Sequence, residues 1–362
     1  MGSQAKVFFV YGTISQSDRA FSLTAAAYNN CAGRGGLLLR FILFGLLILQ
    51  AVDTHSQKVN HQKYQGADLY VYDFCFSPGG SIMAYTDGLT VRLCNPHSME
   101  SGNHLSGGHT DRILSIDMSA DSSMMATGGK DGIILIWNLH TGTVIKRLDY
   151  NHSMVTALRF DPSGTGIVSG SLDGRLVYYD LSEERIRYEN NVHDKIITAV
   201  AVSPGGGIIA SAGADRVLYI TETTTGNIIL NTPDHKNWIR DLEFSPDGSR
   251  LATCGDDRTV ITYNTENSLN ILRMPGGIKE SGRINSVDIN NDNSSLVIGL
   301  DNGLIVVRTV YSRYVVNIGK PVTEVRFMPG TGAEVILVAA TYGSGLLRIP
   351  MAELKLKEKK AP

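Results

Sequence analysis

The chain has 362 residues, enough for one large domain or two to three ordinary ones. Hydrophobic residues make up 43% and charged residues 19%, which is a globular balance, and the net charge of −2 gives no electrostatic reason to expect binding to nucleic acid or to an anionic membrane surface. The 38 glycines are too many for a helical bundle and suit short strands joined by tight turns.

The first predicted element is an apolar stretch from Leu37 to Val52 that contains Arg40 and Gln50. A membrane-spanning helix needs about 20 residues, and the apolar region of a signal peptide normally lies nearer the start of a chain. Three interpretations stay open: a short signal-anchor, a helix packed on the rest of the chain or on a partner, or an extension with no folded role. If the stretch is an anchor, Arg40 and the preceding Arg34 favour a cytosolic N-terminus and a lumenal remainder.

One turn signature recurs through the rest of the chain and sets the period of the fold. Its five clear copies follow one another at equal steps of 42 residues and begin at Ser77, Ser119, Asp161, Ser203 and Ser245. Two weaker copies begin at Asn290 and Met328, after steps of 45 and 38 residues. A fixed period of this length indicates an array of repeated structural units.

Each turn lies between short apolar runs, such as 158–160 before a turn and 166–169 after it. Proline or glycine between such runs predicts the tight hairpins of a meander of about four strands. One sheet of this size cannot bury both of its faces, whereas seven sheets packed around an axis can, and the ring leaves only short edges. The predicted fold is therefore all-β, a seven-bladed β-propeller, with eight blades as the alternative if residues 1–60 add one.

Four kinds of side chain follow the same period in blades 2 to 5. A histidine lies 9 or 10 residues before each turn and an aspartate 21 or 22 residues after that histidine, while serine or threonine precedes the aspartate by four residues and an aromatic residue or threonine follows it by six. In chain order the sets are His109, Thr127, Asp131 and Trp137; His152, Ser169, Asp173 and Tyr179; His193, Ser211, Asp215 and Thr221; and His235, Thr253, Asp257 and Tyr263.

With Gly108-His109 before this spacing and Trp137-Asn138 after it, the pattern resembles the Gly-His to Trp-Asp repeat of the WD-repeat (WD40) β-propeller family. The resemblance covers about four-fifths of the chain and is specific, because four elements are phased together. It implies that the four side chains of each set form a hydrogen-bonded structural network inside their blade. Charge-assisted hydrogen bonds are strong, and a buried network is costly to leave incomplete.

The remaining blades depart from the pattern. In blade 1, Ala67 and Cys94 stand where histidine and tryptophan are expected, and Asp87 lies one residue out of register. In blade 6 the places of His, Asp and Trp hold Glu280, Asn302 and Arg308. Blade 7 has no His–Asp pair that the spacing can place.

Serine, histidine and aspartate at matched spacing also suggest a hydrolase, but here the set repeats every 42 residues. A catalytic triad is single and lies in one pocket, so the repetition indicates a structural role. The four cysteines form no CxxC pair, and the chain has neither a glycine-rich phosphate loop nor a Gly-x-Ser-x-Gly elbow. We therefore expect no catalysis, no cofactor and no metal site.

The predicted partner-binding site is a ring of residues at one mouth of the central channel. The position seven residues before each turn marks the start of an innermost strand, and on the geometry of the family these positions surround one mouth. They hold Tyr70, Arg112, Met154, Ile196, Trp238, Arg283 and Pro321. Tryptophan, tyrosine and arginine dominate binding hot spots, so we expect partner proteins or peptides to bind here. The alternative is that these residues only cap the apolar inner strands.

The ring also needs an outer strand for blade 7, which ends near residues 349–350. Segment 58–64 is the favoured donor of that strand and segment 6–10 the less favoured one. The predicted organisation is an N-terminal extension over 1–57 with the hydrophobic segment 37–52, a propeller over 58–354, and a basic tail over 355–362.

The resemblance implies a non-catalytic protein–protein interaction scaffold or adaptor that assembles a multiprotein complex through the propeller rim, in the cytoplasm or nucleus. One alternative is a membrane-tethered propeller in secretory traffic, anchored in an endomembrane through Leu37–Val52. Another is a substrate-receptor subunit of a ubiquitin ligase. Some members of the family carry a Trp-Asp-x-Arg box for that task, but the matching places of that arginine here hold His140 and Ser182.

Overall fold

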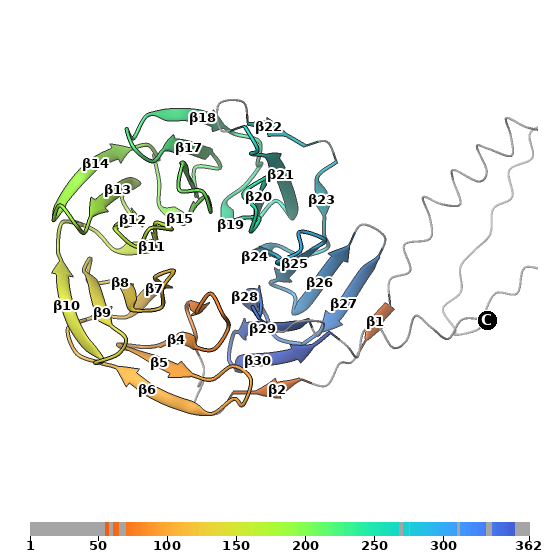
Figure 1. Ribbon diagram of the computed structural model, residues 1–362. Coiled ribbons are helices and arrows are strands. Elements are labelled where there is room, and N and C mark those ends of the chain that lie inside the picture. Colours follow the sequence, from red (N-terminus) through yellow and green to blue (C-terminus); the bar gives the residue numbers. More distant parts are fainter. Residues whose placement is uncertain are drawn as a thin grey trace, which may run out of the picture. The chain divides into compact units, whose positions relative to one another are not determined.

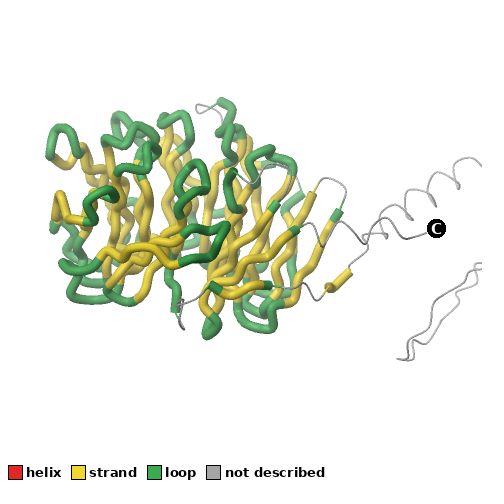
Figure 2. Tube along the Cα trace, turned by 60° about the horizontal axis from the view of Figure 1, so that its bottom comes forward, coloured by secondary structure: helices red, strands yellow, loops and turns green. Residues whose placement is uncertain are grey.

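The computed structural model describes residues 55–57, 61–64, 70–267, 271–274, 276–309, 312–330 and 335–351. In these residues all regular structure is β-strand, and the strands form seven sheets (Figure 1). The sheets stand side by side around a central axis as the blades of a propeller (Figure 1), and Figure 2 shows the same ring tilted. The prediction of an all-β, seven-bladed propeller is therefore confirmed. The predictions for the segment 37–52 and for the tail 355–362 lie outside the described residues.

The first four blades are four-stranded antiparallel meanders. Blade 1 has β3 (Phe74–Phe76), β4 (Met83–Asp87), β5 (Thr90–Cys94) and β6 (Ser101–Leu105). Blade 2 has β7 (Ile113–Met118), β8 (Met124–Gly129), β9 (Ile134–Asn138) and β10 (Thr143–Leu148). Blade 3 has β11 (Val155–Phe160), β12 (Gly166–Ser171), β13 (Arg175–Asp180) and β14 (Arg185–Asn191). Blade 4 has β15 (Ile197–Val202), β16 (Ile208–Gly213), β17 (Leu218–Glu222) and β18 (Ile228–Thr232).

The last three blades have irregular outer edges. Blade 5 has β19 (Ile239–Phe244), β20 (Arg250–Gly255) and β21 (Thr259–Asn264), and its outer edge is split into β22 (Leu272–Arg273) and β23 (Ile278–Lys279), which both pair with β21. Blade 6 has β24 (Ile284–Ile289), β25 (Ser295–Leu300), β26 (Leu304–Thr309) and β27 (Arg313–Asn317), with β1 (His55–Gln57) added outside β27. Blade 7 has β28 (Val322–Phe327), β29 (Ile336–Thr341), β30 (Gly345–Pro350) and β2 (Gln62–Lys63).

The recurring turn signature joins the first strand of a blade to the second. In blade 5 the Ser245 hydroxyl donates to Asp247 (2.6 Å) and accepts the N–H of Arg250 (2.9 Å), so that the serine holds both ends of the turn. Gly248 has φ 72°, a left-handed conformation that glycine adopts at little cost. This geometry explains why four of the five clear copies end in glycine, while the copy that begins at Ser119 places Ser122 in the same conformation (φ 59°).

The core lies between the blades and not inside any one of them. The buried side chains form seven apolar clusters, and each cluster joins two neighbouring blades. The cluster of blades 4 and 5, for example, packs Ile220 of β17 against Ile239 and Leu242 of β19. Burial of apolar surface therefore stabilises the ring as a whole, because every blade contributes to two clusters.

An N-terminal segment closes the ring. β2 pairs antiparallel with β30 of blade 7. The buried Tyr64 that follows β2 connects blades 7 and 1, because its N–H donates to the Leu346 carbonyl in β30 and its hydroxyl donates to the Pro96 carbonyl in blade 1. β2 falls within the segment 58–64 that the sequence favours for this task. The strand β1 pairs in parallel with β27, although its residues lie in the segment assigned to the extension. Within the described residues, sheet pairing with the propeller thus begins at His55.

Candidate functional site

The residues predicted to surround one channel mouth all lie directly before an innermost strand or, for Tyr70, before the equivalent extended segment 71–73. We call Tyr70, Arg112, Met154, Ile196, Trp238, Arg283 and Pro321 the mouth ring. In blades 2 to 7 the carbonyl group of the mouth-ring residue accepts a hydrogen bond from the turn between the second and third strands of the same blade, as Trp238 does from Asp256 (2.9 Å). The turn residues that donate these bonds form a second ring, the turn ring, with Lys130, Leu172, Ala214, Asp256, Asp301 and Tyr342.

Tyrosines form the mouth at blades 7 and 1. The Tyr70 hydroxyl donates to the Tyr342 hydroxyl (2.6 Å), and the two rings meet edge to face with centroids 4.8 Å apart. This bond raises the pKa of Tyr70 above its ordinary value. Arg112 of blade 2 donates to the hydroxyl of Tyr72 (2.9 Å). These contacts hold a row of tyrosine rings in fixed positions beside the channel.

Ion pairs support the mouth at blades 5 and 6. Arg240 donates two hydrogen bonds to Asp256 (2.8 and 2.7 Å) and lies over the Trp238 ring, 4.9 Å from its centroid. Arg283 bonds Asp301 at 2.8 Å. A cation over an aromatic face attracts it, so Arg240 orients the indole ring of Trp238 while leaving 38% of the residue exposed.

At blades 3 and 4 the mouth ring and the turn ring hold aliphatic side chains. Met154 and Ile196 of the mouth ring are half-buried, while Leu172 of the turn ring is 41% exposed. Ala214 is buried. The channel mouth is therefore chemically uneven, with tyrosines on one side, aliphatic side chains opposite, and Trp238 with paired arginines between them.

Exposed aromatic side chains gather at this mouth. The described residues include four exposed aromatic residues, and all four lie at the mouth: Tyr70, Tyr72, Trp238 and Tyr342. The exposed large apolar residues Val144, Ile145, Ile228 and Leu272 lie instead on outer strands. Ordered aromatic side chains that are exposed to water at one place are typical of a binding surface.

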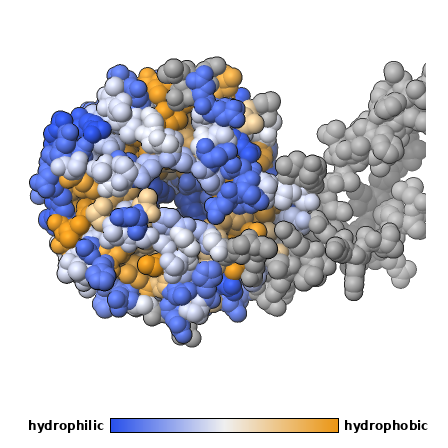
Figure 3. All heavy atoms as spheres, viewed as in Figure 1, coloured by the Kyte–Doolittle hydropathy of each residue, from blue (hydrophilic) through white to orange (hydrophobic). Residues whose placement is uncertain are grey.

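Below the mouth, polar side chains line the channel, whose hydrophilic interior is visible at the centre of the ring in Figure 3. Each innermost strand from β7 to β28 has a register shift at its second residue, for example at Thr156 between Val155 and Ala157. Side chains normally alternate between the two faces of a strand, and this bulge lets two consecutive residues line the same pocket. The channel wall therefore consists of layers with one residue from each blade.

Side chains of the wall connect neighbouring blades. Asp73 of blade 1 accepts from the hydroxyl of Ser115 and from the N–H of Ile116 in blade 2 (2.9 and 2.8 Å). Asp241 of blade 5 accepts equivalent bonds from Ser286 and Val287 in blade 6 (3.0 and 3.1 Å). These carboxylates satisfy backbone donors of the next blade, so the polar channel also stabilises the ring.

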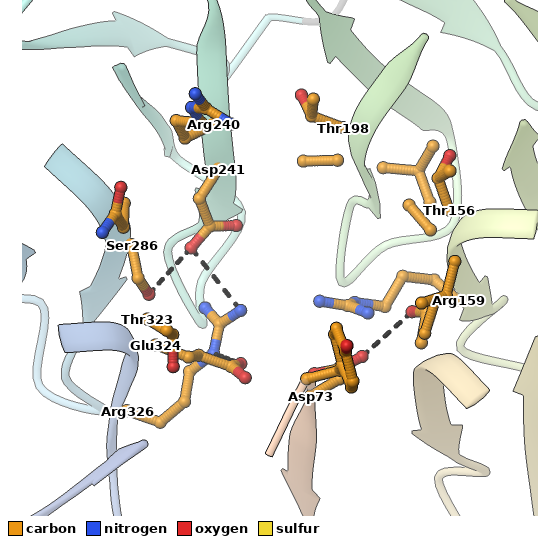
Figure 4. A pocket seen from close by; sticks show the side chains of 17 residues that line it. Asp73, Thr156, Arg159, Thr198, Arg240, Asp241, Ser286, Thr323, Glu324 and Arg326 are labelled. Carbon is orange, nitrogen blue, oxygen red and sulfur yellow. Dashed lines mark hydrogen bonds and ion pairs between the residues drawn. The ribbon is translucent and has the colours of Figure 1, made fainter. Parts of the chain in front are cut away.

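Two arginines extend into the channel from opposite sides, as Figure 4 shows. Arg326 donates to Glu324 and Glu243 (3.0 Å each) and to the Val287 carbonyl (3.1 Å), which joins blades 5, 6 and 7. Arg159 lies near Asp117 and Asp73. Burial raises the pKa of Asp117 to about 6 and that of Asp288 to about 7, and it raises the pKa of Glu243 and Glu324 as well.

Three of the four predicted histidine networks come together. His109 Nδ1 lies 3.1 Å from both carboxylate oxygens of Asp131, its Nε2 lies 2.8 Å from the Thr127 hydroxyl, and Trp137 Nε1 donates to that hydroxyl (3.0 Å). His193 contacts Asp215 and Ser211 in the same way, and His235 contacts Asp257 and Thr253. In blade 4 the hydroxyl of Thr221 is buried without a partner, and in blade 5 the Tyr263 hydroxyl donates to Asp234.

The fourth network differs from its prediction, because His152 is exposed and does not join it. The Tyr150 hydroxyl lies 3.2 Å from that of Ser169, the Tyr150 ring stacks on Tyr179, and Asp173 accepts from Ser171. Steps of 42 residues place the histidine equivalent at Asn151, which is buried. The signal that identifies the mismatch is the spacing of 21 residues to the aspartate, where the other blades have 22.

Ion pairs replace the histidine network in two other blades. In blade 6 the buried Glu280 accepts from Arg308 (2.9 Å) and from Arg313 (2.6 Å), so Glu280 and Arg308 remain partners in the places of His and Trp. The third predicted member, Asn302, instead donates to Ser281. In blade 1, Asp87 accepts from Arg92 (2.6 Å).

Within the described residues, no group of three or more His, Cys, Asp or Glu side chains could hold a metal ion. The same part of the chain contains no helix of the length and hydropathy needed to cross a membrane, and the segment 37–52 lies outside it.

The sequence matches a family model with the description "WD domain, G-beta repeat" at residues 102–138, 142–180, 186–221 and 226–264. Each match begins in or near the outer strand of one blade and ends in the third strand of the next, so the sequence repeat connects neighbouring blades. These four repeats correspond to blades 2 to 5, where the histidine sets were found.

Curated relatives match over short stretches. The chain is 36% identical to mouse "Cilia- and flagella-associated protein 57" over 81 residues, which are 21% of this chain and 6% of that protein. It is 41% identical to "Small ribosomal subunit protein RACK1z" of Arabidopsis thaliana over 56 residues, 16% of this chain and 17% of that one. It is 39% identical to "Periodic tryptophan protein 2 homolog" of Caenorhabditis elegans over 61 residues, 17% and 7% of the two chains. The matched region thus spans only a small part of each relative.

Solved structures match over the whole propeller. The Swd1 β-propeller domain of Myceliophteria thermophila superimposes with a TM-score of 0.70 and 15% identity, over 80% of this chain and 99% of that one. The structure of U3-55K superimposes with a TM-score of 0.68 and 14% identity, over 80% and 98%. At this identity the likeness shows a shared fold.

Proposed function

Because the chain belongs to the WD40-repeat family, we propose that it is a non-catalytic scaffold that captures protein partners on the face around the mouth ring and holds them in one complex. The repeats support an interaction-scaffold kind of function, and the partner-binding face is the finer part of the proposal. The same fold serves many functions, so the argument for this face depends on its own residues.

The observation that carries the proposal is the grouping of all exposed aromatic side chains of the described residues at one channel mouth. Exposed aromatic rings are unfavourable in water, and here they are also held rigid, Tyr70 by Tyr342 and Trp238 by Arg240. A partner that covers them gains buried area while little side-chain entropy is lost, because the rings are already ordered.

The test is the double substitution Trp238→Ala and Arg283→Ala in the full chain. We expect partners that co-purify with the wild type to be depleted at least tenfold, because truncating a hot-spot pair costs more than ~2 kcal/mol of binding. The readout is quantitative mass spectrometry of affinity-purified protein from cells. Thermal unfolding of both proteins is compared to show that the propeller stays folded.

The matched control is Ile145→Ala with Arg185→Ala, which removes one large apolar side chain and one arginine from exposed positions on the outer strands β10 and β14. This variant should retain the wild-type partners. An unchanged partner set in the Trp238→Ala/Arg283→Ala protein would reject the proposed face.

A further inference from the structure

The turn between the second and third strands contains a residue with positive φ in every blade. Five blades use glycine there: Gly88, Gly132, Gly174, Gly303 and Gly343. Blades 4 and 5 use Arg216 (φ 74°) and Arg258 (φ 67°) instead. A side chain in the left-handed region costs free energy that glycine avoids. At this turn, blades 4 and 5 therefore carry backbone strain that the other five blades avoid.

Contacts explain two of the other non-glycine residues with positive φ, but they do not explain these arginines. Glu184 bonds Lys146 (2.7 Å), and Met99 packs on the apolar cluster of blades 7 and 1. Arg216 makes only a long hydrogen bond to the carbonyl of its neighbour Asp215 (3.4 Å), and the Arg258 side chain has no hydrogen bond or ion pair within the described residues. Both are exposed, so neither arginine stabilises its turn through a partner.

The space around this turn position differs between blades. In blade 3 a Cβ at Gly174 would lie 2.1 Å from the carbonyl oxygen of His193, and in blade 6 a Cβ at Gly303 would lie 2.9 Å from the N of Lys320, so the loop that leads to the next blade excludes a side chain there. At Gly88 of blade 1 and Gly343 of blade 7 an added Cβ would meet nothing within 4 Å. Blades 4 and 5 are the two that carry a side chain at this position, and both arginines are exposed.

Two lysines stand beside the arginines. Lys236 follows His235, and its N–H donates to Asp257 (2.8 Å), the residue before Arg258. Lys195 lies in the equivalent loop, which His193 ties to Asp215 before Arg216. We call Lys195, Arg216, Lys236 and Arg258 the basic arc; all four are exposed, and none has a side-chain ion pair within the described residues.

Most carboxylates near the basic arc already have hydrogen-bond partners. Asp215 and Asp257 bond the buried histidines, and Arg240 holds Asp256 with two hydrogen bonds. Hydrogen bonds from His235, Thr259 and Lys236 lower the pKa of Asp257 although burial opposes the shift, so this group stays ionised inside its network. Asp194 is the exposed acid next to the arc. Four exposed cations without an ion pair in the described residues thus lie in the loops and turns of blades 4 and 5, where Lys195 directly precedes Ile196 and Lys236 lies two residues before Trp238 of the mouth ring.

We propose that the basic arc binds an anionic peptide segment, rich in aspartate and glutamate, of a partner captured on this face. Arg216 and Arg258 contact its carboxylates through their paired N–H groups, Lys195 and Lys236 add charge, and Trp238 at the inner side of the arc covers an apolar side chain of the same segment. Guanidinium matches carboxylate in a two-bond geometry that lysine cannot provide, which explains arginine at the strained positions. This inference rests on the proposed function, because it specifies the partner chemistry of the same face.

The test uses the full-length protein and a fluorescein-labelled peptide of glutamate and serine residues with one central leucine, with binding measured by anisotropy. Arg216→Gly with Arg258→Gly should weaken binding at least fivefold. Its thermal midpoint should equal or exceed that of the wild type, because glycine relieves the strain. The affinity of the wild type should fall with added salt, because exposed charges are screened.

The matched control is Lys130→Ser with Lys320→Ser, which removes two exposed cations from the same face in blades 2 and 7. It changes the net charge by the same amount and should bind the peptide within twofold of the wild type. A lysine-for-glutamate version of the peptide should not bind.

Three results would overturn the inference: equal binding by the double-glycine variant and the wild type, an equal loss in the control, or a fall in the thermal midpoint that assigns the arginines a structural role. Tighter, arc-dependent binding of an oligouridylate probe would also overturn it in favour of RNA. If Trp238→Ala/Arg283→Ala loses its cellular partners while the double-glycine variant binds normally, the scaffold function stands and only the anionic partner is rejected.

Discussion

At the scale of single residues, the histidine networks join a loop to the blade it leads into. Burial lowers the pKa of His109, which leaves the ring neutral at pH 7. Nδ1 faces the Asp131 carboxylate and therefore carries the proton, so Nε2 accepts from the Thr127 hydroxyl, which in turn accepts from Trp137. Hydrogen bonds thus run in one direction from the Trp137 N–H through the Thr127 hydroxyl and the His109 ring to the Asp131 carboxylate.

A pair of histidine substitutions separates a network member from a bystander. His109→Ala leaves Asp131 and Thr127 without their buried partner and should destabilise the protein by about 2–4 kcal/mol. His152→Ala removes an exposed ring that makes no such contact, and it should change stability by less than ~0.5 kcal/mol. Urea denaturation of both variants measures the difference. Equal destabilisation would show that His152 has a structural role after all.

At the scale of elements, the 42-residue period predicts more than any single motif does. It predicts the seven blades and the positions of the mouth ring, because both follow from counting between turns. The strand that closes blade 7 is predicted from the missing outer strand of that blade, which ends near residues 349–350. The same count identifies the turn ring and the channel wall, although the predicted site includes neither of them. The bulge at the second residue of each inner strand was not predictable, because it breaks the alternation on which strand patterns depend.

Other features escaped prediction because different side chains fill the same place. Glu280 with Arg308 and Arg313 replaces the histidine network in blade 6, and Tyr150 takes over the contact with Ser169 in blade 3. No spacing rule finds such replacements, since the pairing depends on where long side chains end in space. Single-position patterns therefore identify the regular blades and fail at the irregular ones.

The closing strand gives a prediction at this scale. Tyr64 is almost fully buried and bonds both β30 and the Pro96 carbonyl, so Tyr64→Ala should destabilise the protein by about 3–5 kcal/mol.

Deletion of residues 56–64 should prevent cooperative folding, because blade 7 then loses its outer strand. Deletion of 1–50 is the control and should leave the thermal midpoint within a few degrees of the wild type. A stable protein without residues 56–64 would show that the ring closes in another way.

At the scale of the whole molecule, the channel is where all seven blades meet, and charge is distributed unevenly around it. Blades 3 and 4 contribute small residues such as Ala157 and Ala199, while blades 5, 7 and 1 contribute the carboxylates of Asp241, Glu324 and Asp73. Arg326 binds groups from three blades at once. Each apolar cluster joins two blades, whereas Arg326 joins three.

Replacement of Arg326 tests how much the ring depends on this charge. Arg326→Met keeps the apolar stem but removes the arginine that bonds Glu243 and Glu324 and leaves Arg159 as the remaining channel arginine, which should cost about 3–5 kcal/mol at pH 8. Burial already holds the pKa of both glutamates above its value in the unfolded chain, and loss of the arginine raises it further. The folded state then binds protons that the unfolded state has released, so stability falls as the pH rises above about 4. The defect should therefore be smaller at pH 5 than at pH 8 when urea denaturation is compared with the exposed-site control Arg185→Met. A defect of equal size at both pH values would show that Arg326 acts through packing and its bond to the Val287 carbonyl, and not through the channel carboxylates.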